Sequence, residues 1–181
     1  MQISMHRPEL WWTTALLLLT SVLDATRAYP DGAPEVACDD MMPFHNGARQ
    51  LNGSDSPYRL VQEKETFNAN ESLVVNLFTE SSHFKGFLVK ALDEQGNDVG
   101  HFPPGANYKP MTDCSGATHK SKKKKSAVNF LWQAPVDKAG SVRFKATVVH
   151  DYHLFYTDLW STVKVRKLRP GRVSLAFNKL P

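Results

Sequence analysis

The sequence has 181 residues, of which 41% are hydrophobic, and a formal net charge of +4. A chain of this length can bury a core of ordinary size as one domain, so it needs no dense set of disulfides to fold. The moderate positive charge favours acidic partners such as glycans, anionic lipids or microbial envelopes, although much of the charge lies in two local runs.

The first 28 residues have the organisation of a secretory signal peptide. Arg7 gives a positive flank, residues 10–23 form a mostly apolar run, and Ala28 provides the small residue that signal peptidase requires. The alternative is a membrane anchor, which needs about 20 predominantly apolar residues, and Asp24 closes the run short of that length. We therefore predict a signal peptide over residues 1–28 and a secreted, extracellular protein, with no transmembrane segment after cleavage.

The stretch 29–57 is rich in proline, glycine, aspartate and asparagine, which interrupt helices and long strands. This composition predicts an extended entry segment that contains Cys38. The second cysteine is Cys114, and an even count in an oxidising compartment predicts one disulfide between the two. Its loop of about 77 residues gives an upper figure of roughly 4.5 kcal/mol in the chain-entropy model. The alternative, two free thiols, does not suit an extracellular protein.

Two N-x-S/T sequons begin at Asn52 and Asn70. Both lie in polar, turn-like stretches where a glycan would do no harm to the fold. We therefore predict that these two asparagines are the glycosylation sites of the secreted chain.

Short alternating strands follow the entry segment. Leu73, Val75 and Leu77 share one face of the first strand, and residues 86–92 form a second, which the turn at 94–97 ends. The pattern indicates strands with one face in a core.

The clearest strand signal lies at residues 142–148, where apolar and polar side chains alternate strictly. This period of two is typical of a half-buried strand in an antiparallel sheet. Residues 128–133 alternate in the same way. Residues 159–165 are predicted as a further strand, with Ser161 and Val163 on the same face.

Together these segments predict an all-β fold, a single-domain antiparallel β-sandwich. No stretch after residue 28 sustains the periodicity of a long amphipathic helix. The irregular stretch at 93–127 is longer than a compact sandwich normally carries. We place the sandwich domain at residues 29–166 and a basic C-terminal tail at residues 167–181.

The motifs of common enzyme classes are absent from the sequence. It contains no G-x-S-x-G elbow, H-E-x-x-H helix, phosphate-binding glycine loop or C-x-x-C pair. His150 and His153 flank Asp151 and could hold a metal, but residues three apart on a strand point to opposite faces, so we interpret both as exposed histidines after a strand end. We interpret Asp39 and Asp40 as solvated acids of a turn. We therefore expect no enzyme, no metal and no cofactor.

The run Lys120-Ser121-Lys122-Lys123-Lys124-Lys125 is the feature most suggestive of binding. Five ammonium groups this close together cannot pack inward, and they can attract phosphate or sulfate as point charges. Lipopolysaccharide phosphates, teichoic acids and sulfated glycans all fit this chemistry. The alternative is a solvated loop without a ligand. Nucleic acid does not fit, because no aromatic platform is interleaved with the lysines and the compartment is wrong.

Taken in order, several blocks resemble the reelin-type (reeler) domain family. They are Gly32-Ala33-Pro34 before Cys38, Met42-Pro43 with His45, Ser56-Pro57-Tyr58, Phe84 to Ala91, Cys114 with Thr118-His119 and the lysine run, Val128 to Pro135, and Gly140 to Val149. The resemblance covers nearly the whole chain after residue 28. It implies an immunoglobulin-like β-sandwich, the Cys38–Cys114 disulfide and no catalytic residues.

A single domain behind a signal peptide looks like the insect defence proteins of that family. This resemblance implies a secreted innate-immune protein, induced by bacterial challenge, which binds anionic microbial envelope components and possesses antimicrobial or haemocyte-aggregating activity. The alternative is an extracellular-matrix or adhesion module for sulfated glycans or a host receptor. The redox activity of multidomain family members is not expected here, and the lysines as ligand contacts are an inference from their charge alone.

Overall fold

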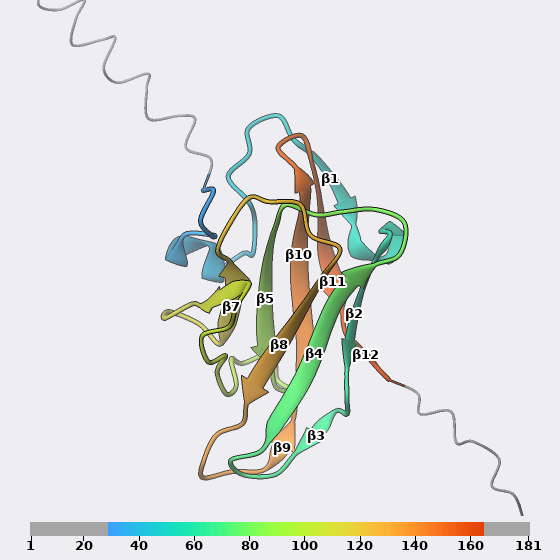
Figure 1. The fold of residues 1–181 in the computed structure, drawn as a ribbon. Coiled ribbons are helices and arrows are strands. Elements are labelled where there is room, and N and C mark those ends of the chain that lie inside the picture. Colours follow the sequence, from blue (N-terminus) through green and yellow to red (C-terminus); the bar gives the residue numbers. More distant parts are fainter. Residues whose placement is uncertain (1–28, 165–181) are drawn as a thin grey trace, which may run out of the picture.

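Two β-sheets face each other in the computed structural model, which describes residues 29–164 (Figure 1). The predicted signal peptide and the predicted tail at 167–181 lie outside the described residues. The elements are the 3-10 helices η2 (Glu35–Cys38) and η3 (Gly53–Asp55) and the strands β1 (Arg49–Asn52), β2 (Tyr58–Gln62), β3 (Thr66–Phe67), β4 (Ser72–Thr79), β5 (Gly86–Leu92), β6 (Tyr108–Pro110), β7 (Gly116–His119), β8 (Ala127–Gln133), β9 (Gly140–Ser141), β10 (Arg143–Asp151), β11 (Leu154–Trp160) and β12 (Thr162–Val163).

The larger sheet has the strand order β1-β11-β10-β5-β7-β6, and the smaller has the order β12-β2-β4-β8. Most neighbouring strands are antiparallel, but β1 pairs with β11 and β12 with β2 in parallel. A short third sheet joins β3 to β9. The predicted all-β sandwich is therefore confirmed, with parallel pairing at one edge of each large sheet.

Alternating side chains of the two sheets meet in one apolar core. The alternation in β10 places Phe144, Ala146 and Val148 in this core at 0% exposure, as predicted. The expectation that the polar residues between them all face water is wrong for Thr147, which is 3% exposed. Trp132 of β8 is also fully buried, and its indole N–H donates to the carbonyl of Val99 at 3.0 Å. This bond satisfies the polar atom of the largest core side chain.

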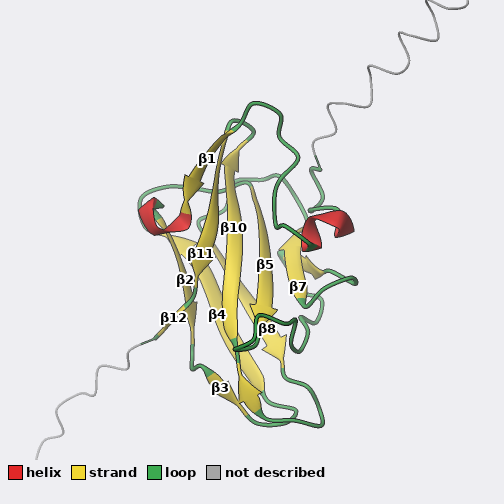
Figure 2. Cartoon of the chain, turned by 180° about the vertical axis from the view of Figure 1, so that it is seen from behind, coloured by secondary structure: helices red, strands yellow, loops and turns green. Residues whose placement is uncertain are grey.

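A second, smaller core lies on the outer face of the six-stranded sheet. Figure 2 shows this face, with η2 lying beside β7. Leu88 of β5 points away from the main core and packs with residues of the entry segment and with Met111. The predicted disulfide joins Cys38 to Cys114 beside this cluster, with 5.9 Å between their Cα atoms. The entry segment is therefore a fixed cover over the sheet.

Gly32 allows the entry segment to come close to β7. Its φ is +121°, a backbone conformation that residues with a side chain rarely adopt. A Cβ at this position would lie 2.7 Å from the carbonyl oxygen of His119. The neighbouring Ala33 donates its backbone N–H to Thr118 Oγ1 at 2.8 Å. The glycine of the Gly32-Ala33-Pro34 block is thus explained by close backbone approach.

The strand predicted at 159–165 is wrong in its bounds. β11 begins five residues earlier, at Leu154, and the chain changes sheets at Ser161 before β12 pairs with β2. Ser161 accepts a hydrogen bond from the Phe144 backbone N–H at 2.8 Å and donates to the Gln62 side chain. These two bonds hold the crossing point between the sheets, whereas Val163 is exposed.

The stretch at 93–127 is not wholly irregular. It contains β6 and β7, which extend the six-stranded sheet beyond β5. β7 is only four residues long but is buried at every position. Alternation of apolar and polar residues could not predict β7, because the entry segment covers its outer face and both faces are therefore buried.

Candidate ligand-binding site

The five lysines of the predicted site lie in the loop between β7 and β8, where they divide into two groups. Lys122, Lys123 and Lys124 are exposed, and in residues 29–164 their ammonium groups form no hydrogen bond or ion pair. Lys120 is exposed as well, but its ammonium group donates to the carbonyl of Gly105 at 2.9 Å. Three lysines are therefore free to meet a ligand with little rearrangement.

Lys125 belongs to the framework of the loop. Its ammonium group donates to the carbonyl oxygens of Lys85 at 2.9 Å, Ser121 at 2.5 Å and Lys123 at 2.7 Å. These three bonds use all the donors of the group. Burial of the side chain lowers the pKa of Lys125. Its backbone also pairs with Phe84 in both directions at 2.9 Å, so this lysine fixes the loop to the segment before β5.

The histidines at the end of β10 differ from one another. His153 is exposed, as predicted, and follows the strand. His150 lies inside β10, is half-buried, and has its Nδ1 2.8 Å from the hydroxyl oxygen of Tyr58. Its ring centroid lies 4.6 Å from that of His83. The prediction of two exposed histidines is therefore wrong for His150, which joins a partly buried polar cluster.

Metal-binding clusters of three or more histidine, cysteine or acidic residues are absent from the described part of the chain. Asp39 and Asp40 are exposed, and Asp40 accepts the backbone N–H of Met42 at 2.8 Å in a turn. The interpretation of these two acids as turn residues fits this geometry.

The two predicted glycosylation sites lie on the surface. Asn52 is exposed at the end of β1, where its side chain accepts the backbone N–H of Ser54 at 2.9 Å. Asn70 is exposed in the turn before β4 with a φ of +59°. Glycosylation of both asparagines stays a prediction.

A cavity of about 500 Å³ lies next to the lysine loop, and sequence reasoning did not find it. Its floor is the outer face of the six-stranded sheet, with Leu88 and Gly86 from β5 and Thr147 and Val149 from β10. Its roof is apolar and comes from the entry segment: Ala33, Pro34, Ala37, Met41, Met42, Pro43 and Phe44. Lys122 of the loop also contributes to the wall.

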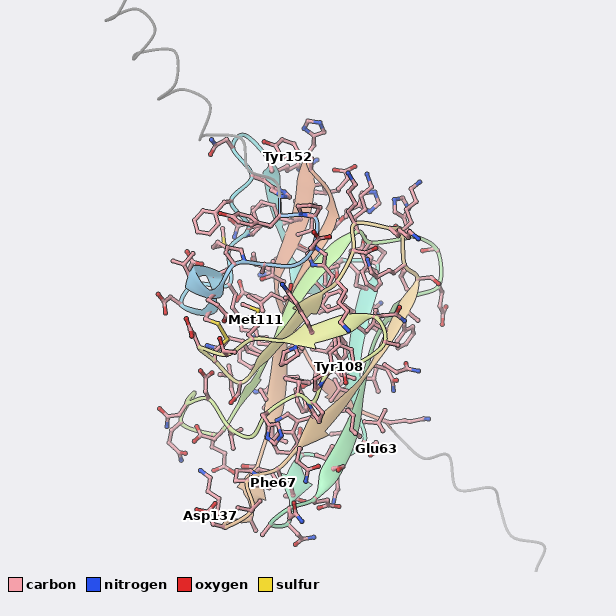
Figure 3. The ribbon with its side chains drawn as sticks, turned by 60° about the vertical axis from the view of Figure 1, so that its left-hand side comes forward. Glu63, Phe67, Tyr108, Met111, Asp137 and Tyr152 are labelled. Atoms are coloured by element: carbon pink, nitrogen blue, oxygen red, sulfur yellow. A yellow bond between two sulfur atoms is a disulfide. The ribbon has the colours of Figure 1, made fainter. Side chains whose placement is uncertain are left out.

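Charged and polar side chains occupy other parts of the cavity wall. They are Lys85, Lys122, Asp151, His45, His119 and Tyr152. Burial lowers the pKa of His119 and of His45, so both rings favour the neutral form. The positive charge of the wall therefore comes from the two lysines. Figure 3 shows Tyr152 at the end of the sandwich opposite Asp137, and the disulfide near Met111.

Gly86 makes room for His119 at the sheet surface. A Cβ on Gly86 would lie 2.9 Å from His119 Cε1, so a side chain at position 86 would displace the ring. The ring is also 5.9 Å from that of Phe87, in an edge-to-face arrangement. The glycine of the Phe84 to Ala91 block thus shapes the cavity wall.

The fold is a β-sandwich module whose outer face carries a disulfide-fixed cover. A family model described as Reeler domain matches residues 36–170. The chain therefore belongs to the Reeler domain family. In the described residues, no helix is long and apolar enough to cross a bilayer.

Two groups of relatives share the domain. The chain is 34% identical over 148 residues to "Putative defense protein 2" of Antheraea mylitta, in a match that covers 75% of this chain and 89% of the relative. It is 27% identical over 160 residues to "Ferric-chelate reductase 1" of Mus musculus, covering 83% of this chain. The chain spans about a quarter of such reductases, 26% of the mouse protein and 24% of a Drosophila melanogaster relative.

Solved structures show the same fold. The human F-spondin reeler domain aligns with a TM-score of 0.52 and 21% identity, over 64% of this chain and 91% of that one. A second structure, of the Reelin-N domain of F-spondin, gives a TM-score of 0.52 and 22% identity, over 63% of this chain and 88% of that one. The immunoglobulin-like sandwich is thus the fold of the family, and the match covers 89% of the defence protein but 26% of the mouse reductase.

Proposed function

We propose that this protein is a secreted defence protein that binds anionic components of microbial surfaces through the loop between β7 and β8. The exposed ammonium groups of Lys122, Lys123 and Lys124 carry the proposal. Synthesis follows bacterial challenge, and binding leads to antimicrobial action or to contact with haemocytes. No reaction is assigned to the domain.

Relatives and geometry support this function in different ways. The relatives that match this chain over most of their own length are named defence proteins. The loop presents three adjacent free cations, and Lys125 holds it in place from beneath. A fixed loop loses less conformational entropy when it binds than a free one does. Phosphate groups of lipopolysaccharide are therefore the ligands we expect first.

The test replaces Lys123 and Lys124 by glutamine and measures binding to purified lipopolysaccharide at several salt concentrations. Each exposed charge pair contributes about 1 kcal/mol at contact distance in water. We therefore expect affinity to fall about fivefold per lysine at low salt, with a weaker salt dependence in the variant. Unchanged affinity and salt dependence would remove the loop from the mechanism.

A matched control changes the same net charge elsewhere. Lys138 and Lys164 are also exposed, and Lys138 follows Asp137 at the opposite end of the sandwich from Tyr152 (Figure 3). The K138Q/K164Q variant should bind lipopolysaccharide with nearly the affinity of the unaltered protein. An equal loss in both variants would indicate that only the net charge matters, which contradicts a loop-specific site.

Heparin, a sulfated glycan, tests the adhesion alternative. Tighter binding to heparin than to lipopolysaccharide, together with constant expression in developing tissue, would favour an extracellular-matrix module. Strong induction of the transcript after bacterial injection would favour defence. The same time course tests the proposed induction directly.

A further inference from the structure

The cavity under the entry segment contains polar atoms that lack partners. Thr147 is 3% exposed, and its Oγ1 has no hydrogen-bond partner among residues 29–164. The Nδ1 atom of His45 is also buried and has no hydrogen-bond partner among these residues. Both residues line the cavity. A buried polar atom without a partner costs about 1–3 kcal/mol. The wall therefore contains two unpaired hydrogen-bonding atoms beside its apolar, aromatic and charged residues.

The size and lining of the cavity suit a small amphiphile. Its volume of about 500 Å³ lies within the range of about 300–1,000 Å³ that is typical of ligand sites. The floor residues Leu88 and Val149 and the methionines and prolines of the roof offer an apolar surface to a hydrocarbon chain. The main core of the domain is filled separately, so a chain in the cavity would displace no core residue.

Four aromatic side chains lie in two pairs beside the cavity, and three of the four are exposed. The rings of Tyr29 and Phe44 meet edge to face at 6.5 Å, and those of His45 and Tyr152 stack at 4.8 Å. All four residues line the cavity, and Phe44 is 51% exposed. Exposed aromatic residues around an apolar cavity are suited to a ligand that has both an apolar body and a wet end.

The charges of the wall indicate the sign of the head group. Lys85 and Lys122 supply two positive charges, and Asp151 supplies one negative charge. The Asp151 carboxylate accepts the backbone N–H of His153 at 2.8 Å and keeps its charge, so the two lysines leave the wall with a net charge of +1; neither lysine forms an ion pair within residues 29–164. The free cations therefore favour an anionic head.

We propose that this cavity binds the acyl chain of an anionic amphiphile, with the chain between the entry segment and the sheet and the phosphate or carboxylate head at Lys85 and Lys122. This inference deepens the proposed function and rests on it for the microbial source of the amphiphile. The exposed loop lysines attract the anionic surface, and one acyl chain of an amphiphile in that surface then enters the cavity.

The test measures binding of monoalkyl phosphates with eight, ten and twelve carbons, below their micelle concentrations, to the full chain secreted by eukaryotic cells. Each buried methylene contributes about 0.8 kcal/mol, so affinity should rise by up to about fourfold per added carbon. Inorganic phosphate, the head group alone, should bind more weakly than any of the three. Equal affinity for all four probes would overturn the proposal.

Two variants locate the chain. Val149→Phe fills the cavity from the floor and should abolish the dependence on chain length. The control Val136→Phe makes the same change at a residue that is 76% exposed and should leave that dependence intact. Retention of the full dependence in Val149→Phe would place the chain elsewhere and overturn the site. If Val149→Phe does not fold, Lys85→Gln with Lys122→Gln decides: affinity should fall equally for every chain length.

Other outcomes separate this inference from the proposed function. Loss of lipopolysaccharide binding in K123Q/K124Q with an unchanged chain-length dependence would support both. A chain-length dependence without any lipopolysaccharide binding would remove the microbial source and keep the cavity ligand. If no alkyl phosphate of any chain length binds, the proposal fails whatever the outcome for lipopolysaccharide.

Discussion

The backbone N–H of Ala33 donates to the hydroxyl oxygen of Thr118 at 2.8 Å, across 85 positions of the sequence. The same hydroxyl donates to the carbonyl of Phe87 at 2.8 Å. Thr118 is 0% exposed, so one side chain joins the entry segment, β7 and β5 in a place that water does not reach. The roof of the cavity depends on this hydroxyl.

Thr118→Val should therefore destabilise the domain. The change leaves the Ala33 N–H and the Phe87 carbonyl without this partner, at about 1–3 kcal/mol for each buried polar group. Thr118→Ser keeps the hydroxyl and should lose much less. Urea unfolding of the two variants measures the difference in the free energy of unfolding; equal losses would show that the methyl group matters and not the hydrogen bonds.

The Cys38–Cys114 disulfide is the covalent counterpart of that contact. It closes a loop with a sequence separation of 76 and fixes the entry segment beside Leu88 and Met111. Replacing both cysteines by alanine should lower the free energy of unfolding by about 2–5 kcal/mol, which is typical for a native disulfide. Comparison of thermal unfolding for the double variant and the reduced wild-type protein checks this. A change below 1 kcal/mol in both would mean that packing alone holds the cover.

Gln62 organises a buried polar network where the two sheets connect. It is 1% exposed, its amide donates to the carbonyl of Val142 at 2.9 Å, and its carbonyl oxygen accepts the Ser161 hydroxyl. The amide also donates to the carbonyl of Lys64 at 2.7 Å. Gln62→Leu removes all three bonds and leaves buried partners unpaired, so we expect a loss of about 2–5 kcal/mol. Gln62→Glu keeps the shape but places a charge in the interior, and it should be no more stable than the leucine variant.

A double variant tests the network itself. Gln62→Leu combined with Ser161→Ala removes the side chains at both ends of one hydrogen bond. If the bond is the cause, the double variant should lose less stability than the sum of the two single variants. Additive losses would mean that the two side chains act independently.

Local alternation predicted the strands in which apolar residues recur at every second position. Strict alternation at 142–148 corresponds to β10, and Leu73, Val75 and Leu77 all enter the main core from β4. β11 and β12 were misplaced because the sheet change at Ser161 depends on Gln62, which is 99 positions away. A period of two within one segment holds no information about such a contact.

The binding region was predicted in part for a similar reason. The exposure of Lys123 and Lys124 follows from charge density alone. The role of Lys125 could not be predicted, because its acceptor at Lys85 lies 40 positions away. The cavity could not be predicted from the sequence, because its roof is formed by a turn-rich stretch without periodicity. The Gly32-Ala33-Pro34 and Met42-Pro43 blocks and the predicted disulfide at Cys38 were the signals that this stretch has a fixed place.

The division of the lysine loop leads to a prediction about single substitutions. Lys125→Gln removes a cation that donates to three carbonyl oxygens, so it should loosen the loop and increase amide hydrogen exchange at residues 120–126. Lys123→Gln changes an exposed charge and should leave exchange unchanged. Hydrogen exchange measured by mass spectrometry compares the two variants. Equal exchange in both would contradict a framework role for Lys125.

His119 should make the stability of the domain depend on pH. Burial lowers the pKa of His119 below its ordinary value of 6.5, so the unfolded chain binds a proton at a higher pH than the folded chain does. Stability should therefore fall as the pH decreases from about 6.5 towards the folded pKa, and this contribution should level off below it. His119→Gln removes the titrating ring and should weaken the slope, although the loss of packing against Phe87 lowers stability at every pH.

His45 and His83 also have lowered pKa values, so H45Q and H83Q serve as controls that keep the His119 contribution. Urea unfolding between pH 4.5 and 7.5 measures the slopes; an unchanged slope in His119→Gln would show that His119 does not cause the acid sensitivity.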